Sequence, residues 1–219
     1  MRKNLTELVF VVDRSGSMSG LEDDTVGGLN ATLRRNREID GECIVSIVLF
    51  DNRSTVIVDR KPIGEVKDLT RSQYQPGGCT ALLDAVGDAV HYTKRVQRIL
   101  PEEYRAEHVM FSIITDGMEN ASTHRSYDEV KRMIEAQQEK GWEFVFLGAN
   151  IDAAAEAGRI GIRPDRASQY MPDGIGNAAA YEAMASAQTS MRTCGSVDPT
   201  WNAAPREDVA KRGGFFRFH

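Results

Sequence analysis

Short apolar runs alternate with longer amphipathic stretches along this chain, and this alternation constrains the fold more than any other feature of the sequence. Runs typical of buried strands occupy 7–12, 42–50, 55–60, 108–115 and 142–149. Helical periodicity is expected over 21–37, 80–96, 126–140, 152–158 and 177–191. Strands that alternate with helices predict an α/β domain built on a mostly parallel sheet.

One pair of strands departs from this alternation. Only the turn "DNRS" separates the strands 42–50 and 55–60, and so short a link predicts an antiparallel hairpin. The expected fold is therefore Rossmann-like: an open, mostly parallel sheet with one antiparallel edge strand and helices on both faces. Ligands of such open sheets bind beyond the carboxyl ends of the strands.

The chain has 219 residues, enough for one domain with a sizeable core. The strand-and-helix pattern weakens after residue 160, so we expect a domain over 1–164 and a C-terminal helical extension and tail over 165–219. Near the end of the predicted domain, Gly158 is expected to terminate the short helix 152–158. The last residues, "GGFFRFH" (213–219), join two glycines to three phenylalanines. The tail is expected to dock on its own domain or to remain loose, with docking on a partner or on a neighbouring copy as the alternatives.

The composition is that of an ordinary globular protein, with 41% hydrophobic and 27% charged residues. The net charge of −5 argues against binding of nucleic acid or an anionic membrane surface. No apolar run has the length of a transmembrane helix, and "LVFVV" is too short for a signal-peptide core. The three cysteines suggest neither a disulfide framework nor a zinc cluster, so a cytoplasmic location is expected.

The stretch "VFVVDRSGSMSG" places polar side chains where the first strand ends. Asp13, Ser15 and Ser17 occupy alternate positions, so their side chains can point the same way. Carboxylate and hydroxyl oxygens are hard ligands that suit Mg²⁺ or Mn²⁺. Taken alone, the pattern favours a helix cap, because aspartate and serine are preferred at helix starts.

Two further stretches place oxygen ligands at the same edge of the expected sheet. Thr80 follows a glycine pair in "PGGCTALLDAV", and Asp116 follows the strand 108–115 in "SIITDGMEN". Each residue by itself is more often a cap or a turn residue. Their order, and their strand and helix contexts, favour a shared site with the serine motif.

These three elements resemble the metal-ion-dependent adhesion site of the von Willebrand factor type A family, whose pattern is D-x-S-x-S, then a threonine in a glycine-rich loop, then an aspartate. The resemblance covers about residues 5 to 160 and includes every position of the motif: Asp13, Ser15, Ser17, Thr80 and Asp116. The segments "LFD" and "LGANIDA" are similar to those of small stand-alone bacterial cytosolic members.

The resemblance implies a role for each residue of the motif. Ser15 and Ser17 would bind the metal directly, and Thr80 directly or through water. Asp13 and Asp116 would act mostly through water or by orienting the serines. An acidic side chain, Asp or Glu, of a partner protein would fill the remaining position. The resemblance thus implies a protein-binding module rather than an enzyme, with Mg²⁺ as the expected cation and Mn²⁺ or Ca²⁺ as alternatives.

The main alternative is a metal-dependent phosphohydrolase or phosphotransferase of the haloacid-dehalogenase type. That class uses an aspartate after the first strand as nucleophile, and a second acid two residues later for proton transfer. Here Ser15 stands in the second place. A Walker A loop is absent, "GSMSG" has Met18 where a nucleophile elbow needs serine, and no dinucleotide-binding glycine motif follows the first strand.

Other polar residues follow the strands as well. Asp51 and Asn150 could line the site, although a turn or cap role is the more common one. Glu119 and Asn120 are expected on its rim. Cys79 is expected to be buried and inert, and the four histidines show no ligand spacing.

Overall fold

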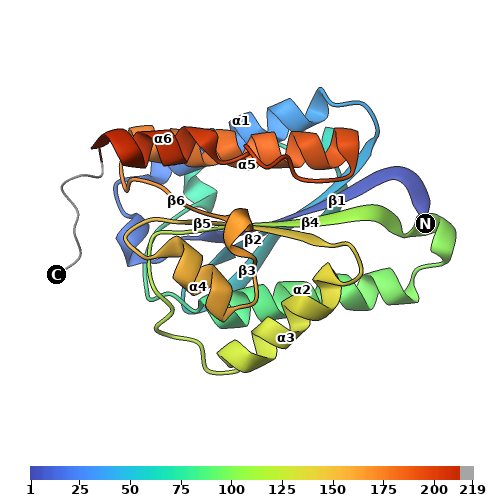
Figure 1. The fold of residues 1–219 in the computed structure, drawn as a ribbon, viewed down its shortest axis with the longest axis horizontal. Helices are drawn as coiled ribbons and strands as arrows, with labels where there is room; N and C mark the ends of the chain where they lie inside the picture. Colours follow the sequence, from blue (N-terminus) through green and yellow to red (C-terminus); the bar gives the residue numbers. More distant parts are fainter. Residues whose placement is uncertain (213–219) are drawn as a thin grey trace.

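A mixed six-stranded sheet lies at the centre of the computed structural model, which describes residues 1–212 (Figure 1). The tail 213–219, for which docking was considered, lies outside the described residues. The strands are β1 (Arg2–Asp13), β2 (Glu42–Phe50), β3 (Ser54–Pro62), β4 (Ala106–Thr115), β5 (Glu143–Gly148) and β6 (Ala167–Gln169).

The strand order is β3-β2-β1-β4-β5-β6, which confirms the predicted α/β topology. β3 is antiparallel to β2 at one edge, and the other neighbours are parallel. β1 is central and buried on both faces, because its side chains alternate between two hydrophobic clusters. Leu8 and Phe10 face one cluster, while Val9 and Val11 face the other.

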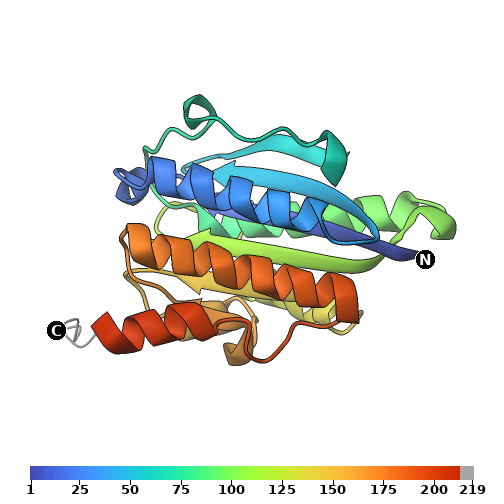
Figure 2. The same cartoon turned by 90° about the horizontal axis from the view of Figure 1, so that it is seen from above.

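The helices cover both faces of the sheet, as predicted (Figure 1). One face carries α1 (Glu22–Arg37), α5 (Gly174–Cys194) and α6 (Ala203–Arg212), which lie side by side in Figure 2. The other face carries α2 (Leu82–Ile99), α3 (Tyr127–Gln138) and α4 (Ala153–Arg159). Among residues 1–212, no helix combines the length and the apolar character that crossing a membrane requires.

Helix ends follow local chemistry, with one departure from expectation at Gly158. Ser126 caps α3 by accepting a hydrogen bond from the Glu129 backbone N–H, but the Glu129 carboxylate pairs with Arg125 instead of closing the capping box. Asp152 caps α4 in the same way as Ser126 caps α3. The helix α4 passes through Gly158 and ends one residue later, because Gly158 keeps helical geometry there and does not adopt a positive φ.

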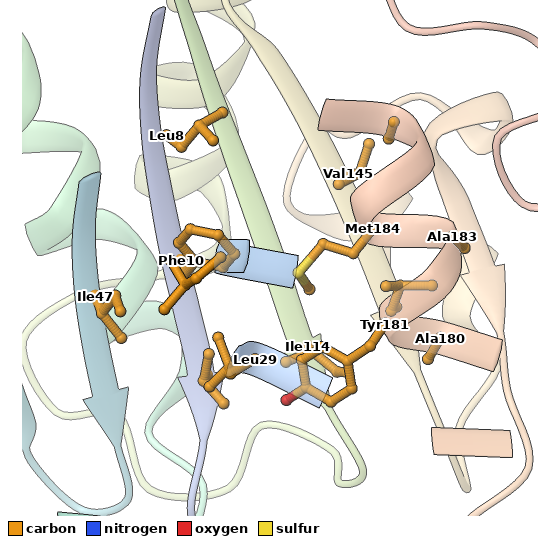
Figure 3. Close-up of a cluster of buried hydrophobic side chains, with 14 of the residues drawn as sticks. Leu8, Phe10, Leu29, Ile47, Ile114, Val145, Ala180, Tyr181, Ala183 and Met184 are labelled. Atoms are coloured by element: carbon orange, nitrogen blue, oxygen red, sulfur yellow. The ribbon is translucent and has the colours of Figure 1, made fainter. Parts of the chain in front are cut away.

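The described part of the expected C-terminal extension shares the core of residues 1–164. β6 pairs in parallel with β5, and α5 packs beside α1 on the sheet. Figure 3 shows Tyr181 and Met184 of α5 pointing toward Phe10 of β1 and Leu29 of α1. All four side chains are buried. β6 and α6 were not predicted, since β6 has three residues and α6 buries only Pro205.

The carboxyl ends of the five parallel strands meet at one edge of the sheet, at the left in Figure 1. Asp13 ends β1, Asp51 follows β2, and Asp116 follows β4. Asn150 lies just beyond β5. The fold therefore brings the predicted polar residues to the same end of the molecule.

Candidate metal centre

The D-x-S-x-S turn and the loop after β4 meet at this edge. Residues Gly16–Met18 form a single 3-10 turn directly after β1. The hydroxyl oxygens of Ser15 and Ser17 are 3.1 Å apart, and the Ser17 hydroxyl donates to Oδ1 of Asp116 at 2.5 Å. Ser17 and Asp116 are 99 residues apart in the chain. The oxygen atoms of Ser15, Ser17 and Asp116 thus form one continuous set.

Asp13 lies beneath this set and is fully buried. Its Oδ1 accepts a hydrogen bond from the Ser15 backbone N–H at 2.6 Å, and its Oδ2 accepts one from the Thr115 hydroxyl at 2.6 Å. Both carboxylate oxygens are therefore engaged by the protein, and they orient the turn that carries the serines. Thr115 was not among the predicted residues, although the parallel register of β1 and β4 places it beside Asp13.

Thr80 approaches the site from a third segment. Its hydroxyl oxygen lies 3.2 Å from the position that a Cβ on Gly117 would take, and the Ser17 hydroxyl lies 3.5 Å from the same position. A side chain at residue 117 would occupy the space between these two hydroxyls. Gly117 keeps that space open. The helix α2 begins at Leu82, so Thr80 stands in the loop before the helix and not within it.

Backbone hydrogen bonds join the glycine loop to the serine turn. Gly77 N–H donates to the Arg14 carbonyl at 2.9 Å, and Gly16 N–H donates to the Gly78 carbonyl at 3.0 Å. The buried Tyr74 hydroxyl donates to the Asp13 carbonyl at 2.5 Å. Tyr74 was not predicted, since nothing in its sequence context marks it. These contacts hold the loop that carries Thr80 against the end of β1.

The two carboxyl groups lie in an environment that opposes their charge. Burial raises the pKa of Asp13 to about 6 and also raises the pKa of Asp116. Within residues 1–212, neither carboxyl forms an ion pair with a basic side chain. The guanidinium of Arg14 is directed instead to Oδ2 of Asp51, at 2.9 Å, and to the Thr55 hydroxyl. A cation bound among these residues would supply the missing positive charge.

The donor set fits a small, hard divalent cation. It consists of two carboxylates and three hydroxyls, from Asp13, Asp116, Ser15, Ser17 and Thr80. The part of the chain that the structure describes has no cluster of three or more His, Cys, Asp or Glu side chains suited to a metal. Any metal held here would therefore depend on the hydroxyl oxygens.

The remaining candidates have other roles. The Asp51 carboxylate accepts hydrogen bonds from the Arg14 side chain and from the Arg53 backbone N–H. The bond from the Arg53 N–H, two residues on, is the one expected of a turn residue. Asn150 is exposed, with a φ of 56° that asparagine tolerates. Asn52 was not predicted, yet its Oδ1 accepts from the Cys79 backbone N–H at 2.9 Å.

The expectation of a buried Cys79 was wrong, because this side chain is exposed. The residue lies in an extended loop next to Thr80, whose side chain turns inward and is buried. Neighbouring side chains of an extended segment point in opposite directions, so an inward Thr80 turns Cys79 toward solvent.

Comparison with solved structures relates this fold to von Willebrand factor type A domains. The chain matches mussel byssus proximal thread matrix protein 1 with 17% identity and a TM-score of 0.58, over 83% of this chain and 45% of that one. It matches the von Willebrand factor domain of the Porphyromonas gingivalis type V pili tip protein Mfa5 with 11% identity and a TM-score of 0.61, over 88% and 98%.

A third match is the manganese-loaded Plasmodium vivax TRAP protein, at 18% identity and a TM-score of 0.54, over 82% of this chain and 73% of that one. The mussel protein has also been solved with zinc in its metal-ion-dependent adhesion site. This chain spans less than half the length of the first of these matches. No family model and no curated protein matches the sequence. The likeness shows the fold of the chain, which is that of a von Willebrand factor type A domain.

Proposed function

We propose that this von Willebrand factor type A fold serves as a metal-dependent protein-binding module. Ser15, Ser17 and Thr80 hold the divalent cation through their hydroxyls, while Asp13 and Asp116 orient them and balance the charge. The bound cation, Mg²⁺ in the first instance, supplies an electrophilic position for a carboxylate from Asp or Glu of a partner protein.

One observation carries this proposal: oxygen donors from three separate segments converge around Gly117, with two buried carboxylates that lack a basic partner within residues 1–212. Such an arrangement costs stability unless a cation offsets the charge. The manganese in the Plasmodium structure and the zinc in the mussel structure, both von Willebrand factor type A folds, support the same interpretation by analogy.

The hydrogen bonds of Asp13 disfavour the alternative of a phosphohydrolase. A nucleophilic aspartate needs a free oxygen facing the substrate. Both oxygens of Asp13 accept hydrogen bonds from within the protein, and the side chain is fully buried. Ser15, at the position where that class has its second acid, cannot serve as a general acid at neutral pH.

We further propose a cytoplasmic location. The three cysteines, Cys43, Cys79 and Cys194, are unpaired in the structure, and two of them are exposed. A reducing compartment keeps such thiols from forming disulfides.

Titration calorimetry of Mg²⁺ and Mn²⁺ into metal-free protein tests the site. We expect saturable binding to one site in the wild type and its loss in the Ser15→Ala/Ser17→Ala double variant. Ser19→Ala is the matched control, because Ser19 is an exposed serine just beyond the turn. Thermal unfolding of all three proteins in chelator shows whether each variant is folded.

Acetate serves as the probe for the partner carboxylate. We expect acetate to bind only when the cation is present. If the folded wild type binds neither cation, even with millimolar acetate, the metal-dependent function is wrong. If the purified protein hydrolyses a generic phosphate ester and Asp13→Asn abolishes this turnover, the enzyme alternative is correct.

A further inference from the structure

The start of helix α2 has no cap of its own. The residue before it, Ala81, has no side chain that can accept a hydrogen bond from the first turn. The first N–H groups of any helix lack partners within the helix and need acceptors from elsewhere. Thr80 stands immediately before this uncapped start, so whatever satisfies these groups also determines where Thr80 lies.

The acceptors come from the loop that follows Asp116. Oε2 of Glu119 accepts a hydrogen bond from the Leu83 backbone N–H at 2.8 Å, and the Ser122 hydroxyl accepts one from the Asp84 backbone N–H at 3.0 Å. Oε1 of Glu119 also accepts from the backbone N–H groups of Ala121 and Ser122. The loop after β4 thus caps α2 in place of a local residue.

Asn120 extends this contact to Thr80 itself. The side-chain Oδ1 of Asn120 accepts from the Thr80 backbone N–H at 2.9 Å, and the Asn120 backbone N–H donates to the Thr80 carbonyl at 3.0 Å. The peptide groups on both sides of Thr80 are therefore bound to one residue. On the other side, the Ala81 N–H donates to the Asp51 carbonyl at 2.9 Å.

Asp84 returns the contact from the helix to the loop. Its carboxylate accepts from the backbone N–H groups of Thr123, His124 and Arg125. The helix start and the loop are therefore joined in both directions. Because Asp116 begins this loop and Thr80 precedes this helix, the two metal-site residues are held relative to each other by protein contacts alone.

We propose that Asn120 is a positioning residue of the metal centre, assisted by Glu119. Its side chain contacts the Thr80 backbone rather than any of the five donor side chains. By fixing Thr80 beside Asp116 before a cation arrives, it reduces the ordering that binding would otherwise require. The expected effect of Asn120 on cation affinity rests on the proposed metal-dependent function. The contact between Asn120 and the Thr80 backbone does not.

Two variants separate positioning from general stability. Asn120→Ala removes the acceptor for the Thr80 N–H. Ser122→Ala removes the bond from its hydroxyl to the same helix start and its bond to Glu119, but no hydrogen bond to Thr80. In metal-free protein, we expect Asn120→Ala to speed hydrogen exchange of the Thr80 amide about tenfold or more. We expect Mn²⁺ affinity to fall about tenfold in Asn120→Ala and less than threefold in Ser122→Ala. Asn120→Asp keeps the acceptor and should restore most of the affinity.

The outcomes distinguish this inference from the proposed function. An unchanged Thr80 amide in Asn120→Ala would overturn the inference, as would an equal loss of affinity in Ser122→Ala. If the wild type binds Mn²⁺ and Asn120→Ala binds it within twofold, the inference fails and the function stands. If the wild type binds no cation, the proposed function is wrong, and so is the effect of Asn120 on affinity. In that case the hydrogen-exchange rate of the Thr80 amide still tests whether Asn120 holds the Thr80 backbone.

Discussion

Asp13 determines the chemistry of the site at the scale of the single residue. The chain buries this carboxyl completely and surrounds it with neutral donors, the Ser15 N–H and the Thr115 hydroxyl, rather than with a basic side chain. Neutral hydrogen bonds offset only part of the cost of burying a charge, so the pKa of Asp13 is raised to about 6. A proton and a divalent cation are therefore alternative ways to neutralise the site.

This competition predicts a pH dependence. In metal-free protein, folded Asp13 binds a proton that the unfolded chain releases near pH 4, so the free energy of unfolding should fall as pH rises through about 6. The contribution amounts to roughly 3 kcal/mol in total and is lost between about pH 4 and pH 6, so about 1.4 kcal/mol of it separates pH 5 from pH 7. The measurement is the difference in unfolding free energy between wild type and Asp13→Asn, in chelator, at pH 5 and pH 7.

Added Mg²⁺ should remove the loss at pH 7, because the cation favours the ionised carboxyl. Asp128→Asn, at an exposed position in the first turn of α3, is the control and should show no such dependence. A difference between wild type and Asp13→Asn that is the same at both pH values would contradict this assignment of the proton.

At the scale of elements, the site is a junction of three connections. The turn after β1, the loop before α2 and the loop after β4 contribute the serines, Thr80 and Asp116 respectively. Each connection is bonded to the other two. Gly16 and Gly78 join the turn after β1 to the loop before α2, Thr80 and Asn120 join that loop to the loop after β4, and the Ser17 hydroxyl joins the turn to Asp116. Their mutual placement therefore depends on backbone geometry as much as on the five donor side chains.

The glycine pair before Cys79 allows a direct test of this dependence. Gly78 has a φ of 75°, and a Cβ there would lie 2.2 Å from Oδ1 of Asn52, the acceptor for the Cys79 N–H. We expect Gly78→Ala to lower the free energy of unfolding by about 1–3 kcal/mol and to weaken cation binding. Chemical denaturation and calorimetry provide the two measurements.

Gly77→Ala is the matched control, because a Cβ at Gly77 meets nothing within 4 Å and its φ is not positive. It should leave the free energy of unfolding within about 0.5 kcal/mol of the wild type. Equal effects of the two substitutions would show that the loop conformation is not what supports Thr80.

At the scale of the whole molecule, the C-terminal segment completes the domain. β6 adds the last strand, and α5 covers the face of β1 and β4 beside α1. Met184 and Tyr181 of α5 belong to the same hydrophobic cluster as Phe10 (Figure 3). Without α5, this cluster would be open to solvent. We therefore propose that residues 165–212 are required for folding and are not an appendage.

Substitutions in α5 test this proposal. Met184 is fully buried, and Met184→Ala should lower the free energy of unfolding by about 2–5 kcal/mol through lost burial and a cavity. Ile175→Ala is the control on the same helix, since Ile175 is 66% exposed and its loss should cost less than about 0.5 kcal/mol. A chain ending at residue 164 should show no cooperative thermal unfolding; a cooperative transition in that fragment would contradict the requirement.

The sequence by itself determined the fold class and the antiparallel edge strand, and it proposed which polar residues lie at the edge of the sheet. Strand and helix periodicity identified five strands and five helices, because apolar runs and amphipathic repeats are local properties. The short link after Phe50 predicted the antiparallel edge. The motif residues were proposed from their order along the chain and their resemblance to the adhesion-site pattern of the von Willebrand factor type A family. β6 and α6 were missed because neither has a strong local pattern.

Only the tertiary structure decided how these residues are held. Thr115 meets Asp13 through the register of two parallel strands, and Tyr74 reaches the Asp13 carbonyl across 61 positions of sequence. Asn120, expected only on the rim, binds the backbone of Thr80. Such contacts join segments far apart in the chain, so no local pattern encodes them. The local residue types provide the donors, and the packing of distant segments decides their geometry.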